Sequence, residues 1–324
     1  MGIKDAIPKT QDAIRYKFGR IGVLMGGPST EREISLKSGK AVYESLKELG
    51  LDVIAVDIKT DDLKQNSCLI KSKGIDCAFI ALHGRFGEDG QIQTILDGLK
   101  IPYTGSGAKA SMLAMDKIAS RKIFQEHGLN VPRYMILESS SFNSNQVVYS
   151  ELHLPWVVKP ATHGSSIGLS IIDRSEDLDK ALELAFGFDE RVLIEEYIEG
   201  RELTVGILED RALSVIEIRP KKRFFDFQAK YEYGMTQYFV PAQLDGDITH
   251  QVQETALLAH KLLGCFGFSR VDMMLNRRNI PFVLELNTIP GLTLTSLLPK
   301  AAKAEGIDFG QLCLRLLKLA YEKK

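Results

Sequence analysis

An arginine, two carboxylates and an amide stand close together near the end of this sequence, in types and spacing that suit phosphate and metal chemistry. The run Arg270–Leu275 and the run Pro281–Asn287 both have the composition of strands, and a polar turn joins them. Because strand side chains alternate between two faces, Arg270 shares a face with Asp272, and Glu285 shares one with Asn287. Carboxylate and amide oxygens are ligands that Mg²⁺ prefers, usually together with substrate phosphates.

The same alternation sorts the remaining side chains of the two runs. Val283 is expected on the face of Glu285, whereas Leu284 is expected on the opposite, apolar face together with Met273, Leu275 and Leu286. A surface hairpin whose acidic residues merely face water is the alternative interpretation of this stretch.

Composition narrows the function classes. The chain has 324 residues, of which 44% are hydrophobic and 26% are charged, as in soluble globular proteins. A formal net charge of −1 provides no global field that would attract nucleic acid or an anionic membrane. The four cysteines have no metal-type spacing, and there is no signal-like or membrane-spanning apolar run. We therefore expect a cytoplasmic protein without a nucleic-acid or membrane partner.

Strands and helices alternate between residues 20 and 104, which predicts a parallel sheet with ligands at the carboxyl ends of its strands. Two loops fall there, Gly26–Glu31 and His83–Asp89. The glycines after the first strand do not form the dinucleotide-binding fingerprint, which disfavours an oxidoreductase. Glu31 would repel a pyrophosphate and suits a cationic group, although it could simply complement the helix dipole. His83 could equally be a structural histidine.

Further along the chain, a lysine precedes a small flexible loop. The strand ending at Lys159 is followed by the loop Ala161–Gly168 and then by a strand at Leu169–Ile172. Such a hairpin can fold over phosphates, because its N–H groups and hydroxyls donate while the lysine supplies charge. It is not a Walker loop, and an ordinary mobile turn is the alternative.

Two later stretches also have binding character. Glu195, Glu196 and Glu202 gather acceptors where the amino group and ribose of a nucleotide could dock, or else form an exposed edge. The segment Arg219–Pro241 is predicted to be irregular and is rich in basic and aromatic residues, which favours a lid. RNA binding is the weaker alternative for it.

Taken together, these motifs resemble the D-alanine–D-alanine ligase family of the ATP-grasp superfamily. Eight motifs occur in the family's order and span nearly everything from Gly19 to Leu317: GGPSTEREISLKSG, ALHGRFGEDG, PYTGSG, MDK, VVKPATHGSSIG, AKY, RVD and LELNTIPGLT.

The resemblance implies an α/β protein with the three-domain ATP-grasp architecture. An extension at residues 1–18 would precede an N-terminal domain with a parallel sheet at 19–105. A central domain at 106–200 and a C-terminal domain at 201–324, with the lid at 219–241, would hold ATP between them. Both of these would be α+β domains.

The resemblance also implies roles for individual residues. ATP would be bound by Lys117, Lys159, Ser165, Ser166, Glu195, Glu196, Tyr197, Ile198, Glu202 and Lys230. Two Mg²⁺ or Mn²⁺ ions would be held by Asp272, Glu285 and Asn287. The two D-alanine molecules and the tetrahedral intermediate would be contacted by Glu31, His83, Arg270, Gly291, Ser296 and Leu297.

Within that set, Glu31 would bind the first ammonium and His83 would lie near the first carboxylate. Arg270 and the Gly291 N–H would stabilise the oxyanion, whereas Ser296 and Leu297 would accommodate the second D-alanine.

Three lid and loop positions complete the comparison. Tyr231 would join Ser165 and Glu31 in a hydrogen-bonded trio. Phe227 departs from the tyrosine of several relatives, and His163 occupies a variable position to which no role is assigned.

The activity implied is ATP-dependent ligation of two D-alanine molecules through a D-alanyl phosphate, for peptidoglycan precursor synthesis, by a homodimer. A D-alanine–D-lactate ligase on the same scaffold is the nearest alternative. A non-catalytic nucleotide-binding module is a remote one, because such a module is expected to lose metal ligands.

Overall fold

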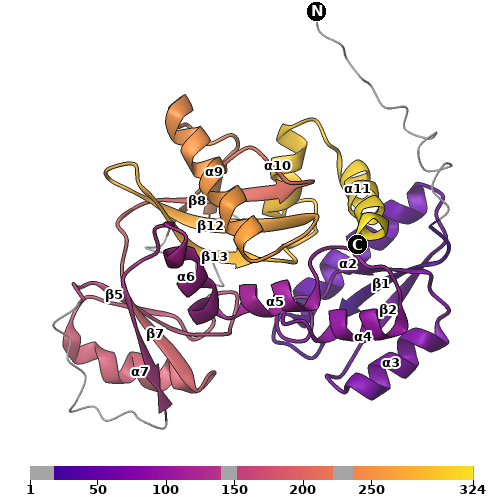
Figure 1. Cartoon of the computed structure of the whole chain (residues 1–324), viewed down its shortest axis with the longest axis horizontal. Helices are drawn as coiled ribbons and strands as arrows, with labels where there is room; N and C mark the ends of the chain where they lie inside the picture. Colours follow the sequence, from indigo (N-terminus) through magenta and orange to yellow (C-terminus); the bar gives the residue numbers. More distant parts are fainter. Residues whose placement is uncertain (1–17, 140–151, 222–235, 324) are drawn as a thin grey trace, which may run out of the picture.

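The structure is a computed structural model in which residues 18–139, 152–221 and 236–323 are described (Figure 1). Its N-terminal part is the predicted parallel sheet, with strand order β2-β1-β3. The elements are β1 (Ile21–Gly26), α2 (Arg32–Glu48), β2 (Val53–Ile58), α3 (Leu63–Ser72), β3 (Cys77–Ile80) and α4 (Gln91–Leu99). At the end of the predicted alternation, where residues 101–104 suggest a last short strand, the structure has only a single bridge between Ala78 and Tyr103.

A second, antiparallel sheet has the order β4-β7-β5-β6 and carries the predicted hairpin as β5 and β6. Its elements are β4 (Tyr134–Glu138), β5 (Trp156–Pro160), β6 (Ser170–Ile172), η3 (Ser175–Asp177), α7 (Leu178–Phe186) and β7 (Arg191–Glu196). Helix α7 places Leu178, Ala181, Leu182 and Ala185 at helical spacing, and all four are buried against this sheet.

The third sheet has the order β11-β10-β8-β12-β13, with β9 paired to β8. Its elements are β8 (Gly200–Leu208), β9 (Arg211–Ala212), β10 (Ile216–Pro220), β11 (Thr236–Phe239), α9 (Gly246–Leu262), β12 (Phe268–Asn276) and β13 (Pro281–Asn287). The expectation of irregular structure throughout Arg219–Pro241 is wrong at both ends, because β10 and β11 pair there as antiparallel strands. Residues 222–235 lie outside the described part.

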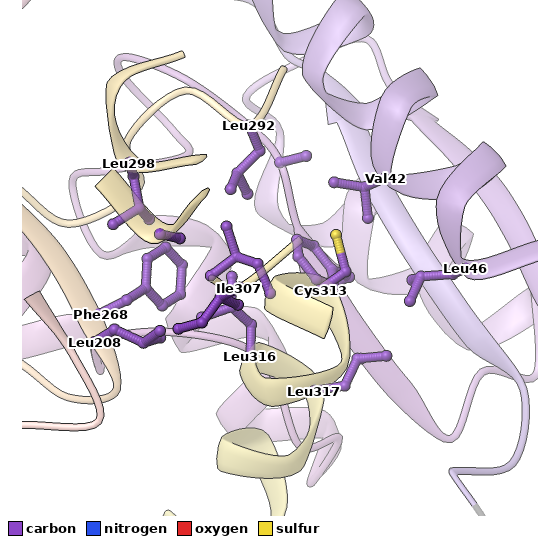
Figure 2. Close-up of a cluster of buried hydrophobic side chains, with 14 of the residues drawn as sticks. Val42, Leu46, Leu208, Phe268, Leu292, Leu298, Ile307, Cys313, Leu316 and Leu317 are labelled. Atoms are coloured by element: carbon purple, nitrogen blue, oxygen red, sulfur yellow. The ribbon is translucent and has the colours of Figure 1, made fainter. Parts of the chain in front are cut away.

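Four more helices join the sheets to one another: α5 (Ala108–Met115), α6 (Lys117–Glu126), α10 (Leu297–Ala304) and α11 (Phe309–Glu322). Ala114 of α5 and Phe124 of α6 are buried in a core that the third sheet dominates. Helix α11 packs beside α2, and Figure 2 shows Leu316 and Leu317 in one cluster with Val42 and Leu46. The C-terminal segment is therefore fixed against the N-terminal sheet.

The register of β12 and β13 confirms the shared polar face. Arg270 pairs with Asn287, and Asp272 pairs with Glu285. Directly paired residues on neighbouring strands point to the same side of a sheet. The four side chains therefore form one polar patch, as the alternation predicts.

At Val283 and Leu284, just before Glu285, the alternation fails because the strand pair contains a β-bulge. Met273 pairs with Val283, so that Leu284 is an extra residue without a partner of its own in this ladder. Val283 consequently joins the apolar core, whereas Leu284 lines a cavity. The prediction that placed these two side chains on the reverse faces is wrong.

Among the described residues, no helix is both long enough and apolar enough to cross a membrane.

Candidate active site

Two cavities of about 420 and 410 Å³ adjoin where the three sheets meet, and both are lined by Lys117 and Glu285. Every predicted site residue in the described part of the chain lines at least one of them. Lys230, Tyr231 and the departure at Phe227 lie outside the described residues.

The first cavity combines residues from the N-terminal and third parts of the fold with the glycine–serine loop, residues Ala161–Gly168. Its predicted residues are Glu31, His83, Lys117, Ser165, Arg270, Glu285, Asn287, Gly291, Ser296 and Leu297. The second cavity lies between the second and third sheets. Its predicted residues are Lys117, Lys159, Ser166, Glu195, Glu196, Tyr197, Ile198, Glu202, Asp272 and Glu285.

Glu31 and Ser165 connect two distant parts of the chain across the first cavity. Glu31 immediately precedes α2 and is buried, and the Ser165 hydroxyl donates a hydrogen bond to its carboxylate. Ser165 and Ser166 have φ values of 53° and 58°, in the left-handed region that non-glycine residues seldom adopt. Such backbone conformations cluster at ligand clamps and active sites. The loop is thus shaped, and held, over the junction of the two cavities.

Lys117 reaches the same junction from the start of α6. Asp116 caps this helix by accepting from the N–H groups of Ile118 and Ala119. The Lys117 ammonium donates to the His163 carbonyl at 2.6 Å and lies 3.5 Å from a Glu285 carboxylate oxygen. Its charge therefore stands between the glycine–serine loop and the polar patch of β12 and β13.

Two buried charges that line the second cavity, Lys159 and Glu195, form a group with the buried Arg121. The Glu195 carboxylate lies 3.0 Å from the Lys159 ammonium and 2.9 Å from the Arg121 guanidinium. Burial lowers the pKa of Lys159 to about 8, with the Glu195 charge opposing that shift. Arg121 also donates to the carbonyl of Leu284 at 3.0 Å, and so supports the bulged residue of β13.

The polar patch itself is internally bonded. Asp272 accepts two hydrogen bonds from Arg270, at 2.8 and 2.7 Å, and one from the Thr204 hydroxyl at 2.6 Å. The Asn287 side-chain oxygen accepts from the Ile289 N–H at 2.9 Å. This network fixes where the carboxylate and amide oxygens lie.

The donor set fits a hard cation that is shared with substrate oxygens. Within the described residues, no group of three or more His, Cys, Asp or Glu side chains is arranged to hold a metal ion. Asp272, Glu285 and Asn287 instead offer two carboxylates and one amide on a single face. Mg²⁺ commonly takes one or two protein carboxylates and completes its octahedron with phosphate and water oxygens.

His83 is held by protein groups at both ring nitrogens. Nδ1 lies 3.0 Å from the Ile289 carbonyl oxygen, and Nε2 lies 3.0 Å from the Ser38 hydroxyl. Nearby, burial raises the pKa of Glu88, whose carboxylate lies 3.4 Å from Nδ1.

Sequence reasoning missed several residues that belong to these networks. Arg121 is a buried polar residue inside α6, where no motif marks it, and Ser38 is a buried residue of the first motif to which no role was assigned. Glu217 lines the second cavity and is bonded by Arg201 and Arg219. Burial alone would raise the pKa of Glu217, but the hydrogen bonds from the two arginines outweigh it and lower the pKa.

Comparisons with known proteins agree with this arrangement. The family model described as D-ala D-ala ligase N-terminus matches residues 60–106, and the one described as D-ala D-ala ligase C-terminus matches residues 123–318. The D-alanine--D-alanine ligase of Geotalea uraniireducens is 44% identical over 313 residues, which cover 96% of this chain and 98% of that protein. The one from Desulforudis audaxviator is 46% identical over 308 residues, covering 94% and 99%.

Solved structures give the same result. The D-alanine--D-alanine ligase from Bacillus anthracis complexed with ATP superimposes with a TM-score of 0.82 at 34% identity, covering 94% of this chain and 97% of that one. The VanG D-Ala:D-Ser ligase from Enterococcus faecalis reaches 0.79 at 31% identity, covering 93% and 99%. The fold, the order of the motifs and these matches show that this chain belongs to the D-alanine–D-alanine ligase family.

Proposed function

We propose that the protein joins two D-alanine molecules into D-alanyl-D-alanine and converts ATP to ADP and phosphate. The observation that carries the proposal is the meeting of the two cavities at Lys117 and Glu285. One cavity suits a nucleotide and the other suits small zwitterions, so the γ-phosphate of a nucleotide in one would face a carboxylate in the other.

The second cavity has the chemistry of an ATP site. Met274, Leu284 and Ile171 give it apolar walls for a base, and Glu202 offers acceptors for a ribose. Lys159 in its lining supplies positive charge. The ligase from Bacillus anthracis, which has the same fold, was solved as a complex with ATP.

Asp272, Glu285 and Asn287 are the proposed ligands of two Mg²⁺ or Mn²⁺ ions. When bound, the metal would neutralise phosphate charge during transfer. The protein's part is to hold these oxygens in place through Arg270, Thr204 and the Ile289 N–H.

In the first step, a D-alanine carboxylate oxygen attacks the γ-phosphorus of ATP, and ADP leaves with the electrons of the broken bond. Glu31 would bind the substrate ammonium, and Lys117 and Lys159 would neutralise charge on the phosphates. The product of this step is D-alanyl phosphate, which water hydrolyses readily. Ser165 and the loop around it would close the junction of the cavities against water.

In the second step, the neutral amine of another D-alanine attacks the acyl carbon, and inorganic phosphate leaves. The attacking nitrogen loses its proton as the amide bond forms, and the departing phosphate takes that proton up. Negative charge develops on the acyl oxygen, where Arg270 and the Gly291 N–H would stabilise it. Ser296 and Leu297 line the same cavity and would accommodate the second substrate.

We also infer the domain boundaries, the oligomeric state and the location of the enzyme. The extension at 1–18 would be followed by domains at 19–105, 106–200 and 201–324, with a lid within 219–241. We expect a homodimer in the cytoplasm that supplies peptidoglycan synthesis. The trio of Tyr231, Ser165 and Glu31 would favour an amine over a hydroxyl as the second nucleophile.

The test is phosphate release from ATP with D-alanine, L-alanine, D-serine or D-lactate as the added substrate. Release that requires D-alanine and yields the dipeptide supports the proposal. Ester formation from D-alanine plus D-lactate at a comparable rate would make the D-alanine–D-lactate ligase the better assignment. Nucleotide binding without turnover under every condition would favour a non-catalytic module.

A further inference from the structure

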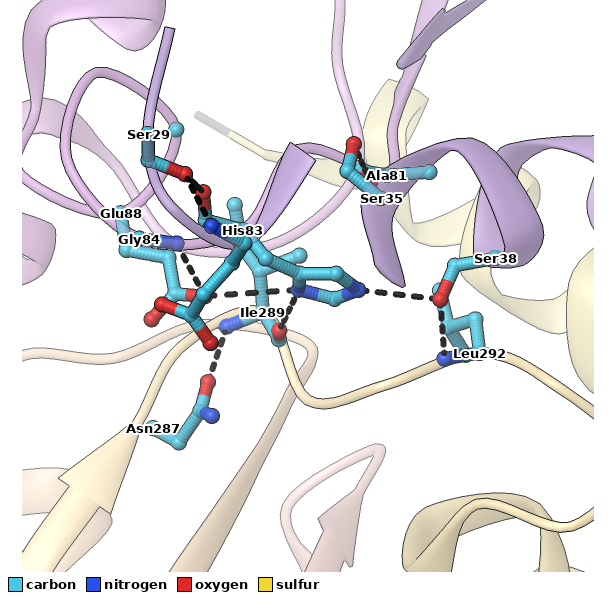
Figure 3. Close-up of polar contacts among 12 residues, drawn as sticks. Ser29, Ser35, Ser38, Ala81, His83, Gly84, Glu88, Asn287, Ile289 and Leu292 are labelled. Atoms are coloured by element: carbon cyan, nitrogen blue, oxygen red, sulfur yellow. Dashed lines mark hydrogen bonds and ion pairs between the residues drawn. The ribbon is translucent and has the colours of Figure 1, made fainter. Parts of the chain in front are cut away.

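We infer that Ser38 and His83 are positioning residues for the Gly291 N–H, and that His83 acts through the protein backbone rather than on substrate. The inference rests on the proposed function, because it concerns the oxyanion donor of the second step. Figure 3 shows the network that carries it.

The segment between β13 and α10 belongs to the third sheet by sequence but is anchored in the N-terminal part. Ile289 is buried in a cluster that consists mainly of N-terminal residues, among them Leu24 and Leu82. Leu292 is buried in the cluster that contains Val23 and Val42. Gly291 thus lies between one side chain in an N-terminal core and one in a core that N-terminal and C-terminal residues share.

The backbone of this segment is bonded on both sides of Gly291. The Ile289 carbonyl lies 3.0 Å from His83 Nδ1, and the Leu292 N–H donates to the Ser38 hydroxyl at 3.2 Å. His83 Nε2 and the Ser38 hydroxyl, 3.0 Å apart, close the link between these two contacts. All of it is buried: Ser38 is fully inaccessible, and His83 is 4% exposed.

Hydrogen-bond chemistry permits one arrangement of protons that satisfies every contact with a neutral ring. A carbonyl oxygen only accepts, so Nδ1 must carry the proton that reaches Ile289. Nε2 of a neutral ring then has only a lone pair, so the Ser38 hydroxyl, which accepts from the Leu292 N–H, donates its own proton to Nε2. The Glu88 carboxylate, 3.4 Å from Nδ1, favours the same tautomer. Both ring nitrogens are therefore engaged by protein groups.

These contacts determine the direction of the Gly291 N–H. The Gly291 N–H stabilises an oxyanion only when it points to where the oxygen will be, and a displacement of about an ångström is enough to lose much of that effect. The Ser38–His83 pair fixes the residues before and after Gly291 from a separate part of the fold. Removal of either side chain should let the N–H drift while leaving the ATP cavity intact.

The experiment compares Ser38→Ala, His83→Ala, the double variant and a matched control, Ser269→Ala. Ser269 is also fully buried and also bonds a buried histidine, His260, at 2.7 Å, but it lines neither cavity. The control therefore loses the same kind of serine–histidine hydrogen bond away from the Gly291 segment. Wild-type dipeptide formation is measured first, so that failure of the proposed function is recognised separately.

Removal of one oxyanion donor lowers kcat by about 10²–10³. Displacement of the donor should cost less, roughly ten- to a hundredfold in kcat for Ser38→Ala, with KM for ATP changed by less than about twofold. Ser269→Ala should keep kcat within about twofold of wild type. The double variant should lose little more than the worse single variant, because both side chains act through one segment.

The two partial reactions provide a second readout. Scrambling of heavy oxygen between the bridging and non-bridging positions of ATP reports acyl phosphate formation, and it should persist in Ser38→Ala while dipeptide formation falls. The inference is overturned if Ser38→Ala retains wild-type kcat. It is equally overturned if His83→Ala raises KM for D-alanine without lowering kcat and its effect adds to that of Ser38→Ala, since that pattern belongs to a direct substrate ligand.

Discussion

Lys159 should take up a proton when ATP binds near pH 8. Burial lowers the pKa of this lysine to about 8 in the free protein, so at pH 8 roughly half of the molecules carry it uncharged. The phosphates of a nucleotide favour the charged form and raise the pKa again. Binding at pH 8 should therefore absorb roughly half a proton per nucleotide, and almost none at about pH 6.5, where the lysine is already charged.

The sign of the effect on affinity follows. Above pH 8 the free protein must first gain a proton, so ATP affinity should fall by up to about tenfold for each further pH unit. The effect of Lys159 on the stability of the free protein has the opposite dependence on pH. An unfolded lysine keeps its ordinary pKa of 10.5, so between about pH 8 and 10.5 the unfolded chain binds more protons, and this residue's contribution to the free energy of unfolding rises with pH.

Isothermal titration calorimetry of ATP binding in two buffers of different ionisation enthalpy measures the proton uptake directly. Lys159→Met should abolish the buffer-dependent heat at pH 8. Lys117→Met, which removes the other lysine of the site but leaves Lys159 in place, should weaken binding and retain the uptake. Equal heats in the two buffers for wild type at pH 8 would refute this account of Lys159.

Three other predictions concern the metal ligands, the buried charges and the lid. Asp272→Asn and Glu285→Gln should each remove most ligase activity without unfolding the protein. The control Glu199→Gln, at an exposed ion pair with Arg277, should keep its activity. Near-normal turnover of both site variants in ordinary Mg²⁺ would contradict the metal assignment. Arg121→Met should lower the free energy of unfolding in urea by about 3–5 kcal/mol, because Glu195 stays buried with one cation instead of two. Arg133→Met, at an exposed ion pair, should lower it by no more than about 1 kcal/mol. Equal losses would show that the buried ion pair stabilises the fold no more than the exposed one. Tyr231→Phe should raise the ratio of D-lactate to D-alanine use by several-fold, in line with one hydrogen bond worth about 0.5–1.5 kcal/mol, and an unchanged ratio in a product assay would remove Tyr231 from the account.

Alternation along the strands was enough to predict the shared face of Arg270, Asp272, Glu285 and Asn287. The same rule failed for Val283 and Leu284, just before Glu285, because a bulge depends on how two strands pair and leaves no mark in either strand alone. For this reason Val283 and Leu284 were each predicted on the face that the other one occupies.

Buried polar residues were harder to predict than motifs. A local pattern interprets Arg121 as one more charge on an amphipathic helix, since its partner Glu195 lies on a distant strand. The contacts of Ser38 and His83 with the Ile289–Leu292 segment likewise arise only in the folded chain, because that segment lies far away in the sequence. Helices α5 and α10 were not predicted either. Both are only eight residues long, and much of their stability comes from burial against other elements.

The most direct test of the central claim follows oxygen from D-alanine. The protein is incubated with ATP, Mg²⁺ and D-alanine labelled with heavy oxygen in its carboxylate, and the products are analysed by mass spectrometry. Activation through D-alanyl phosphate predicts D-alanyl-D-alanine together with inorganic phosphate that carries one labelled oxygen per dipeptide formed. Dipeptide with unlabelled phosphate, or ATP consumption without dipeptide, would contradict it.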